Sequence, residues 1–124
     1  AVAAEAAMAV LEAIQSEGLL GNARATGLYL KEGIRTLAAR HPCIGDVRGA
    51  GLFLGVDIVS DRAARTPDPA MATRIVNGLR DERVLISACA RAANVLKIRP
   101  PLIFTREQAD ILVERLDRVL SRCA

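Results

Sequence analysis

A short stretch that ends in two consecutive prolines constrains the fold of this chain more than any other feature. It covers residues 94–102 and reads Asn-Val-Leu-Lys-Ile-Arg-Pro-Pro-Leu. Successive side chains point to opposite faces of a strand, so Leu96 and Ile98 are predicted to face a core. Lys97 and Arg99 then share the opposite face. Because proline cannot donate a ladder hydrogen bond and holds the preceding residue extended, the strand is predicted to end at Arg99.

The two cations of this strand suit an anionic ligand. A guanidinium held at the end of a strand, as predicted for Arg99, matches the planar geometry of a carboxylate or a phosphate. Lys97 adds a second positive charge on the same face, and Arg48 joins them if its strand lies nearby. The spacing alone also fits the solvated side of a half-buried strand with no binding role. The residues leave both interpretations open.

The rest of the chain predicts helices and strands in mixed order, because apolar residues recur with the period of a helix or alternate as in a strand. The expected elements are helices over residues 1–17, 21–40 and 69–83, strands over 44–48, 52–59, 84–88 and 95–99, and a C-terminal helix. Thr105 and Gln108 form a capping box for that last helix. Asp68 is the predicted N-cap of the helix before it. These elements predict a two-layer α+β domain with helices packed on one face of a small, mainly antiparallel sheet.

The first predicted helix, residues 1–17, is apolar on most of its faces. Only Glu5, Glu12 and Gln15 are polar before Ser16. A helix of this kind normally packs inside a protein or against a second one. Each of its alanines exposes little apolar area, so a helix that simply stands in water is the alternative.

The composition argues against several classes of function. Hydrophobic residues make up 52% of the chain and aromatic residues only 2%, which predicts an aliphatic core and no aromatic platform for nucleic-acid bases. No apolar run is long enough to span a bilayer and no secretory leader is visible, so we expect a cytoplasmic protein. Cys43, Cys89 and Cys123 lack the spacing of metal ligands. His41 is expected to interact with a helix end rather than act as a catalytic base.

Two stretches together resemble one known family. Residues 44–57, which read Ile-Gly-Asp-Val-Arg-Gly-Ala-Gly-Leu-Phe-Leu-Gly-Val-Asp, and then residues 94–102 resemble the C-terminal small domain of class III pyridoxal-phosphate aminotransferases. That family includes ornithine, acetylornithine and 4-aminobutyrate aminotransferases and the related amino-alcohol phosphate phospho-lyases. The resemblance covers the whole chain. It implies that residues 1–17 are a linking helix from a large cofactor domain and residues 18–124 the small domain.

The resemblance also implies a substrate-binding role for the basic pair. An arginine just before the proline pair commonly binds a substrate carboxylate in this family, which places that role on Arg99. Many members carry the arginine two residues earlier, where this chain has Lys97. A lysine lacks the planar fork of a guanidinium, but both side chains are predicted to point the same way. The two stretches specify the class and not the amino donor or acceptor.

Such enzymes hold pyridoxal phosphate on a lysine, and the only lysines here are Lys31 and Lys97. Neither resembles the cofactor lysine, so the chain is expected to bind no cofactor and to be inactive alone. The resemblance thus implies that a large pyridoxal-phosphate domain and an amino or oxo acid substrate are its partners. We expect the isolated chain to self-associate, as in a dimer, through its apolar first helix. The alternative is a freestanding α+β interaction or anion-binding module with no catalytic activity.

Overall fold

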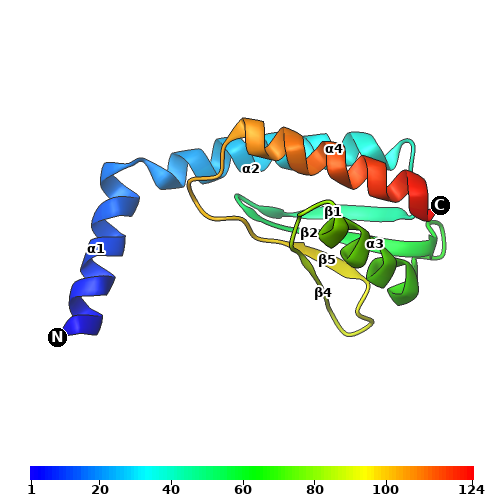
Figure 1. Ribbon diagram of the computed structural model, residues 1–124, viewed down its shortest axis with the longest axis horizontal. Coiled ribbons are helices and arrows are strands. Elements are labelled where there is room, and N and C mark those ends of the chain that lie inside the picture. Colours follow the sequence, from blue (N-terminus) through cyan, green and yellow to red (C-terminus); the bar gives the residue numbers. More distant parts are fainter.

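The computed structural model describes residues 1–124 and confirms the two-layer α+β architecture (Figure 1). The chain forms four helices and five strands. The elements in chain order are α1 (Val2–Ser16), α2 (Leu19–Ala38), β1 (Ile44–Ala50), β2 (Phe53–Asp61), β3 (Thr66–Pro67), α3 (Pro69–Asp81), β4 (Ser87–Cys89), β5 (Val95–Ile98) and α4 (Arg106–Cys123).

All strand pairs of the sheet are antiparallel, and the sequence predicted a mainly antiparallel sheet. Its strand order is β1-β2-β5-β4, and β3 pairs with the end of β2. Each row of paired residues crosses several strands. Val47, Val56 and Leu96 form one row, and all three are buried. Because neighbouring residues of a strand point to opposite faces, this row defines the face of the sheet that meets the helices.

The core between the sheet and the helices is aliphatic, as the composition predicted. Nineteen buried residues form one cluster. Leu30 of α2, Ile75 of α3 and Leu116 of α4 each bring an almost completely buried side chain to it. Helices α2 and α4 lie side by side over the sheet, and α3 packs against both α4 and the sheet (Figure 1). Burial of such side chains is worth about 1.5–3 kcal/mol each before entropy is subtracted.

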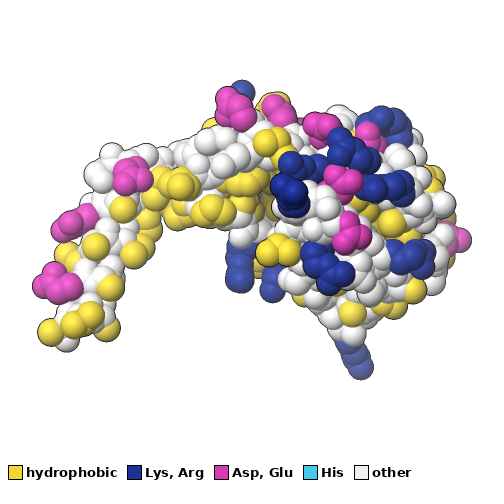
Figure 2. Space-filling model, in the orientation of Figure 1, with side chains coloured by type: hydrophobic (Ala, Val, Ile, Leu, Met, Phe, Trp, Pro, Cys, Tyr) yellow, Lys and Arg dark blue, Asp and Glu magenta, His cyan; other side chains and the backbone are white.

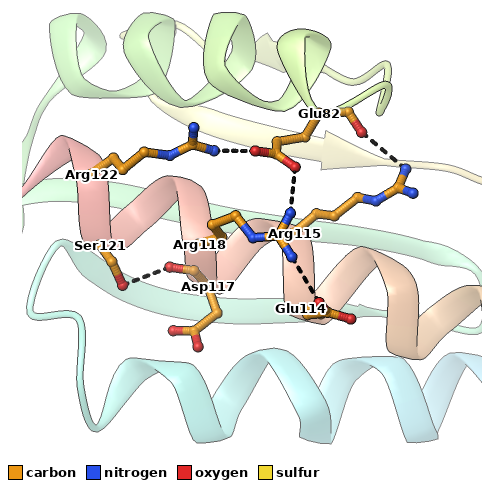
Figure 3. A network of polar contacts seen from close by, with 7 residues as sticks. All are labelled: Glu82, Glu114, Arg115, Asp117, Arg118, Ser121 and Arg122. Carbon is orange, nitrogen blue, oxygen red and sulfur yellow. Dashed lines mark hydrogen bonds and ion pairs between the residues drawn. The ribbon is translucent and has the colours of Figure 1, made fainter.

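A cluster of arginines around Glu82 joins the end of α3 to α4 (Figure 3). The Glu82 carboxylate accepts hydrogen bonds from Arg118, at 2.7 Å, and from Arg122. The Glu82 carbonyl oxygen accepts one from Arg115 at 2.9 Å. Hydrogen bonds from Arg122 and then Arg118 hold the pKa of the Glu82 carboxyl below its ordinary value. Arg118 also donates to Glu114, one turn earlier on α4.

Helix α1 lies apart from the packed layers. It projects away from the sheet and has no buried residue (Figure 1). Among its large apolar side chains, Met8, Val10 and Leu11 are each more than half exposed. Figure 2 shows apolar side chains continuing along α1 onto the neighbouring part of α2, where Leu20 and Leu28 are also exposed. No helix of the structure is long and apolar enough to cross a membrane.

Several predicted boundaries move. Strand β5 ends at Ile98, so Arg99 lies one residue beyond the last paired position. Strand β4 covers 87–89 rather than 84–88, and part of the expected loop over 60–68 pairs as β3. Strand β1 extends through Ala50 into the predicted link, whereas β2 begins at Phe53, one residue later than predicted, which leaves a turn at Gly51 and Leu52.

Candidate functional site

The face of the sheet opposite the helices carries the polar side chains. One row of paired residues on this face consists of Arg48, Gly55, Lys97 and Ser87, from β1, β2, β5 and β4 in turn. Arg48 and Ser87 are exposed, and Lys97 is half-buried. No helix covers this row, because α2, α3 and α4 all pack on the other side. The uncovered face is therefore where the chain can meet a ligand or another domain.

Lys97 lies at the centre of this face. Its neighbour across β2 is Gly55, which has no side chain, and its neighbour on β4 is Ser87. The missing side chain leaves a cleft of about 320 Å³ between Lys97 and Arg48, with Cys89 and Val95 among the other lining residues. The sequence prediction placed Lys97 away from the core, and the structure agrees. Gly55 and Ser87 were not predicted, because only the cross-strand pairing identifies them.

Arg99 follows the last residue of β5, two positions after Lys97. Its side chain is exposed, and both residues line a shallow cleft of about 240 Å³ together with Leu85, Ile86 and Ser87. None of the ion pairs of the molecule involves Lys97 or Arg99. The structure thus brings the two predicted residues to one cleft with both charges free. Their role in binding a substrate stays a prediction.

Arg48 lies in the same row but is not free to bind an external anion in the same way. Its guanidinium is 2.8 Å from Oδ2 of Asp57 and 3.2 Å from Oδ2 of Asp46. The hydrogen bond to Asp57 is the largest cause of a raised pKa for Arg48. The other oxygen of Asp57 is buried and has no hydrogen-bond partner. A third cation for the basic pair therefore comes from Arg48 only if its bonds to these acids break.

His41 has a partner that its sequence neighbours did not reveal. Its Nε2 lies 2.6 Å from Oδ1 of Asp117 on α4, and Arg40 contacts the other oxygen of that carboxylate. Local sequence does not predict this contact, because the two residues are 76 positions apart. The pair bridges α2 and α4, and it lines neither cleft of the basic pair. A catalytic role for His41 gains no support.

The two lysines, Lys31 and Lys97, lie in different surroundings. Lys31 donates a hydrogen bond from Nζ to the carbonyl oxygen of Gly49 at 2.9 Å. Neither cleft that Lys97 lines contains an aspartate or a glutamate that could face the pyridine nitrogen of the cofactor. No group of histidine, cysteine and acidic side chains is arranged to hold a metal ion.

Comparison with known proteins places these features in one family. Residues 1–120 match the family described as aminotransferase class-III. The mitochondrial alanine–glyoxylate aminotransferase 2 homolog 2 of Arabidopsis thaliana is 45% identical over 121 residues, which are 98% of this chain and 25% of that protein. The ethanolamine-phosphate phospho-lyase homolog 1 of Caenorhabditis elegans is 39% identical over 97% of this chain and 26% of its own length.

Two solved structures have the same fold. A phospholyase from Arthrobacter in complex with phosphoethanolamine superposes with a TM-score of 0.87 at 40% identity, over 92% of this chain and 27% of the other. An amine transaminase from an uncultivated Pseudomonas species, in its pyridoxal-phosphate-bound internal aldimine form, gives 0.87 at 38% identity, over 96% and 27%. The chain spans about a quarter of the length of these relatives. It belongs to the class-III aminotransferase family, whose members depend on pyridoxal phosphate.

Proposed function

We propose that this chain is the C-terminal substrate-recognition domain of a class-III aminotransferase. In this proposal residues 18–124 are the small domain, and residues 1–17 are the helix that leads out of a large cofactor-binding domain. The complete enzyme transfers an amino group between an amine or amino acid and a 2-oxo acid. The family match and the share of each relative that the chain covers support this assignment.

One observation carries the proposal: Lys97 and Arg99 line a single cleft and neither is paired with an acid. A hydrogen bond to a charged group contributes about 1.5–3 kcal/mol, so two such groups bind and orient a carboxylate strongly. Arg99 supplies two parallel donors for the two oxygens, and Lys97 supplies a point charge beside them. In this domain the pair holds the substrate while bond making takes place elsewhere.

The cofactor is held by the remainder of the polypeptide. Because neither lysine of this chain has the required surroundings, the lysine that binds pyridoxal phosphate belongs to the large domain. The bound cofactor supplies the electron sink for the chemistry on the substrate. The chain alone is therefore inactive in amino transfer, and its contribution is to place the substrate carboxylate.

The large domain also covers the exposed surface of α1. Helix α1 has 15 residues, none of them buried, and several of its aliphatic side chains are exposed. Removal of this apolar surface from water by packing against another domain is therefore favourable. In the complete enzyme this surface packs against the preceding domain. When that domain is absent, copies of the chain associate through it.

The basic pair also suits phospho-lyase chemistry, because guanidinium and ammonium groups bind a phosphate as well as a carboxylate. A phospholyase solved with phosphoethanolamine is 40% identical to this chain. Elimination of phosphate from an amino-alcohol phosphate is therefore a second candidate activity of the complete enzyme.

A chimeric enzyme tests the proposal. The matching 121 residues of the Arabidopsis thaliana relative are replaced by this chain. We expect the chimera to bind pyridoxal phosphate as an internal aldimine and to transfer amino groups. Lys97→Ala and Arg99→Ala should each raise the KM for a carboxylate substrate by about tenfold or more, because each removes one charge-assisted hydrogen bond. Both variants should leave the aldimine absorbance unchanged.

Arg91→Ala is the matched control, because Arg91 is an exposed cation in the β4–β5 loop and has no ion-pair partner. It should leave KM unchanged. Unchanged KM values in both the Lys97 and Arg99 variants would refute the substrate-binding role. Addition of pyridoxal phosphate to the isolated chain is the second test. An internal aldimine absorbance in that experiment would contradict the proposal that the cofactor lysine belongs to the large domain.

A further inference from the structure

Besides the two clefts that Lys97 lines, a further cleft lies on the helix side of the sheet. It has a volume of about 290 Å³ and lies between β5, the segment over residues 83–86 and the first half of α4. Ile98 and Leu112 form its buried floor, and Phe104 and Ile111 form part of its wall. Ile98 points to the face of β5 opposite Lys97, and Lys97 does not line this cleft. The cleft adjoins the one that Lys97 and Arg99 line, and the two share Leu85, Ile86 and Arg99.

Three guanidinium groups surround this apolar cleft, from Arg83, Arg99 and Arg115. No aspartate or glutamate is among the lining residues. Arg83 and Arg99 are exposed and form no ion pair, while the only protein acceptor of Arg115 is the carbonyl oxygen of Glu82 (Figure 3). Gln108, the other polar lining residue, uses its side-chain oxygen in the capping box of α4. The cleft thus combines an apolar interior with an excess of positive charge at its rim.

The backbone of Arg83 is in a conformation that most side chains avoid. Its φ is 63°, in the left-handed region, directly after the C-cap of α3. Glycine is the usual residue at this position, and another residue pays about 1 kcal/mol there. The chain nevertheless carries an arginine at the mouth of the cleft. Residues that keep a costly backbone conformation cluster at functional sites.

We propose that this cleft binds a small carboxylic acid with an apolar body. The body fills the space over Ile98, Leu112 and Phe104, and the carboxylate meets the guanidinium groups of Arg83 and Arg115. Charge complementarity argues for an anion, and the apolar floor argues against a small inorganic one. The site adjoins the substrate cleft of Lys97 and shares Arg99 with it. Its recognition of the carboxylate rests on Arg83 and Arg115, so it does not depend on the function proposed above.

Binding of 3-phenylpropionate to the isolated chain, followed by NMR titration, tests the proposal. We expect saturable shifts of residues that line the cleft. The uncharged analogue 3-phenylpropanol and the short acid acetate should each bind at least about fivefold more weakly, because each lacks one half of the recognition. Arg83→Gly should weaken binding of the acid by about tenfold, the effect of one charge-assisted hydrogen bond, without lowering the melting temperature.

Two further variants separate the two clefts. Ile111→Trp fills the proposed site and should abolish binding, whereas Lys97→Ala changes only the neighbouring cleft and should leave the affinity unchanged. Three results would each overturn the proposal. They are no binding at all, equal affinity for the acid and the alcohol, and loss of binding in Lys97→Ala while Ile111→Trp still binds. Far-ultraviolet circular dichroism of each variant confirms that the helices remain.

Discussion

The imidazole Nε2 of His41 lies 2.6 Å from Oδ1 of Asp117, a contact that ties the end of α2 to α4. Arg40 lies 3.1 Å from Oδ2 of the same carboxylate. The hydrogen bond with His41 is the largest cause of a lowered pKa for Asp117, and the charge of Arg40 adds to it. The carboxylate of Asp117 is thus favoured in the folded chain over the unfolded one.

This relationship predicts acid sensitivity. A carboxyl group whose pKa is lower in the folded state stabilises the fold at any pH above its unfolded value, close to 3.8. That contribution is lost as the pH falls through the lower folded value. Asp117→Asn should therefore be less stable than the wild type near neutral pH, and the difference should shrink in acid. Urea midpoints measured for both proteins from about pH 6 to about pH 3 test this, and a difference that stays constant would contradict it.

Two glycines of α2 should respond in opposite ways to alanine. A Cβ at Gly27 would lie 2.1 Å from the carbonyl oxygen of Gly51, in the turn between β1 and β2. Gly27→Ala should therefore cost about 1–3 kcal/mol of unfolding free energy, as overpacking does. A Cβ at Gly21 meets nothing within 4 Å, so Gly21→Ala should gain up to about 1 kcal/mol from helix propensity. Chemical denaturation of both variants measures this, and equal effects would disprove close packing at Gly27.

Asn22 should prove important for the segment that follows the proline pair. Its Nδ2 donates hydrogen bonds to the carbonyl oxygens of Leu102, at 2.6 Å, and Phe104, at 3.0 Å. The hydroxyl of Thr26 donates to its Oδ1 and so fixes the amide. Asn22→Ala should destabilise the chain by about 1–2 kcal/mol. Asn22→Asp should do similarly, because a carboxylate has no N–H to donate.

The control for that experiment is Asn77→Ala. Asn77 is exposed on α3, and its side chain takes part in none of the hydrogen bonds of the fold. Thermal unfolding should separate it from Asn22→Ala by several degrees, since 1 kcal/mol shifts the melting temperature of a domain of this size by about 4 °C. Coincident melting curves would show that the Asn22 contacts contribute nothing.

Self-association of the isolated chain should depend on α1. Val10 is 58% exposed, and no residue of the helix is buried. Val10→Glu places a charge in the apolar surface and should shift the chain toward monomer. Gln15→Glu adds the same charge at a polar, exposed position of the same helix and should leave the association unchanged. Sedimentation equilibrium over a wide concentration range is the measurement, and a wild-type chain that stays monomeric throughout would refute the prediction.

The elements that local signals specify were predictable from the sequence. Asp68 caps α3 through a 2.9 Å hydrogen bond from the amide of Met71. Thr105 and Gln108 form the expected reciprocal capping box of α4. These signals involve residues within a few positions of one another, so they require no knowledge of the tertiary fold. The short strand β3 was missed because it exists only by pairing with the end of β2.

The parts of the candidate site that local patterns specify were also predictable from the sequence. Strand alternation was enough to place Lys97 away from the core, and the proline pair was enough to predict the end of β5 to within one residue of Arg99. The ion pair of Arg48 with Asp57 required the register of β1 on β2, in which Arg48 lies opposite Gly55. The approach of Asp117 to His41 required the packing of α4 on α2, which no local pattern encodes.

The junction between α1 and α2 has a consequence for how the chain meets the rest of its polypeptide. Gly18 lies between the two helices with φ at 62°, and a Cβ added to it would meet nothing within 4 Å. The direction of α1 relative to α2 is thus set at the short link of Glu17 and Gly18, and α1 has no buried residue that would hold it in place. A rotation at this link would redirect the whole helix without uncovering a buried side chain of α1. In the complete enzyme proposed above, the surface that packs on α1 would therefore set the angle between this helix and the sheet that carries the basic pair.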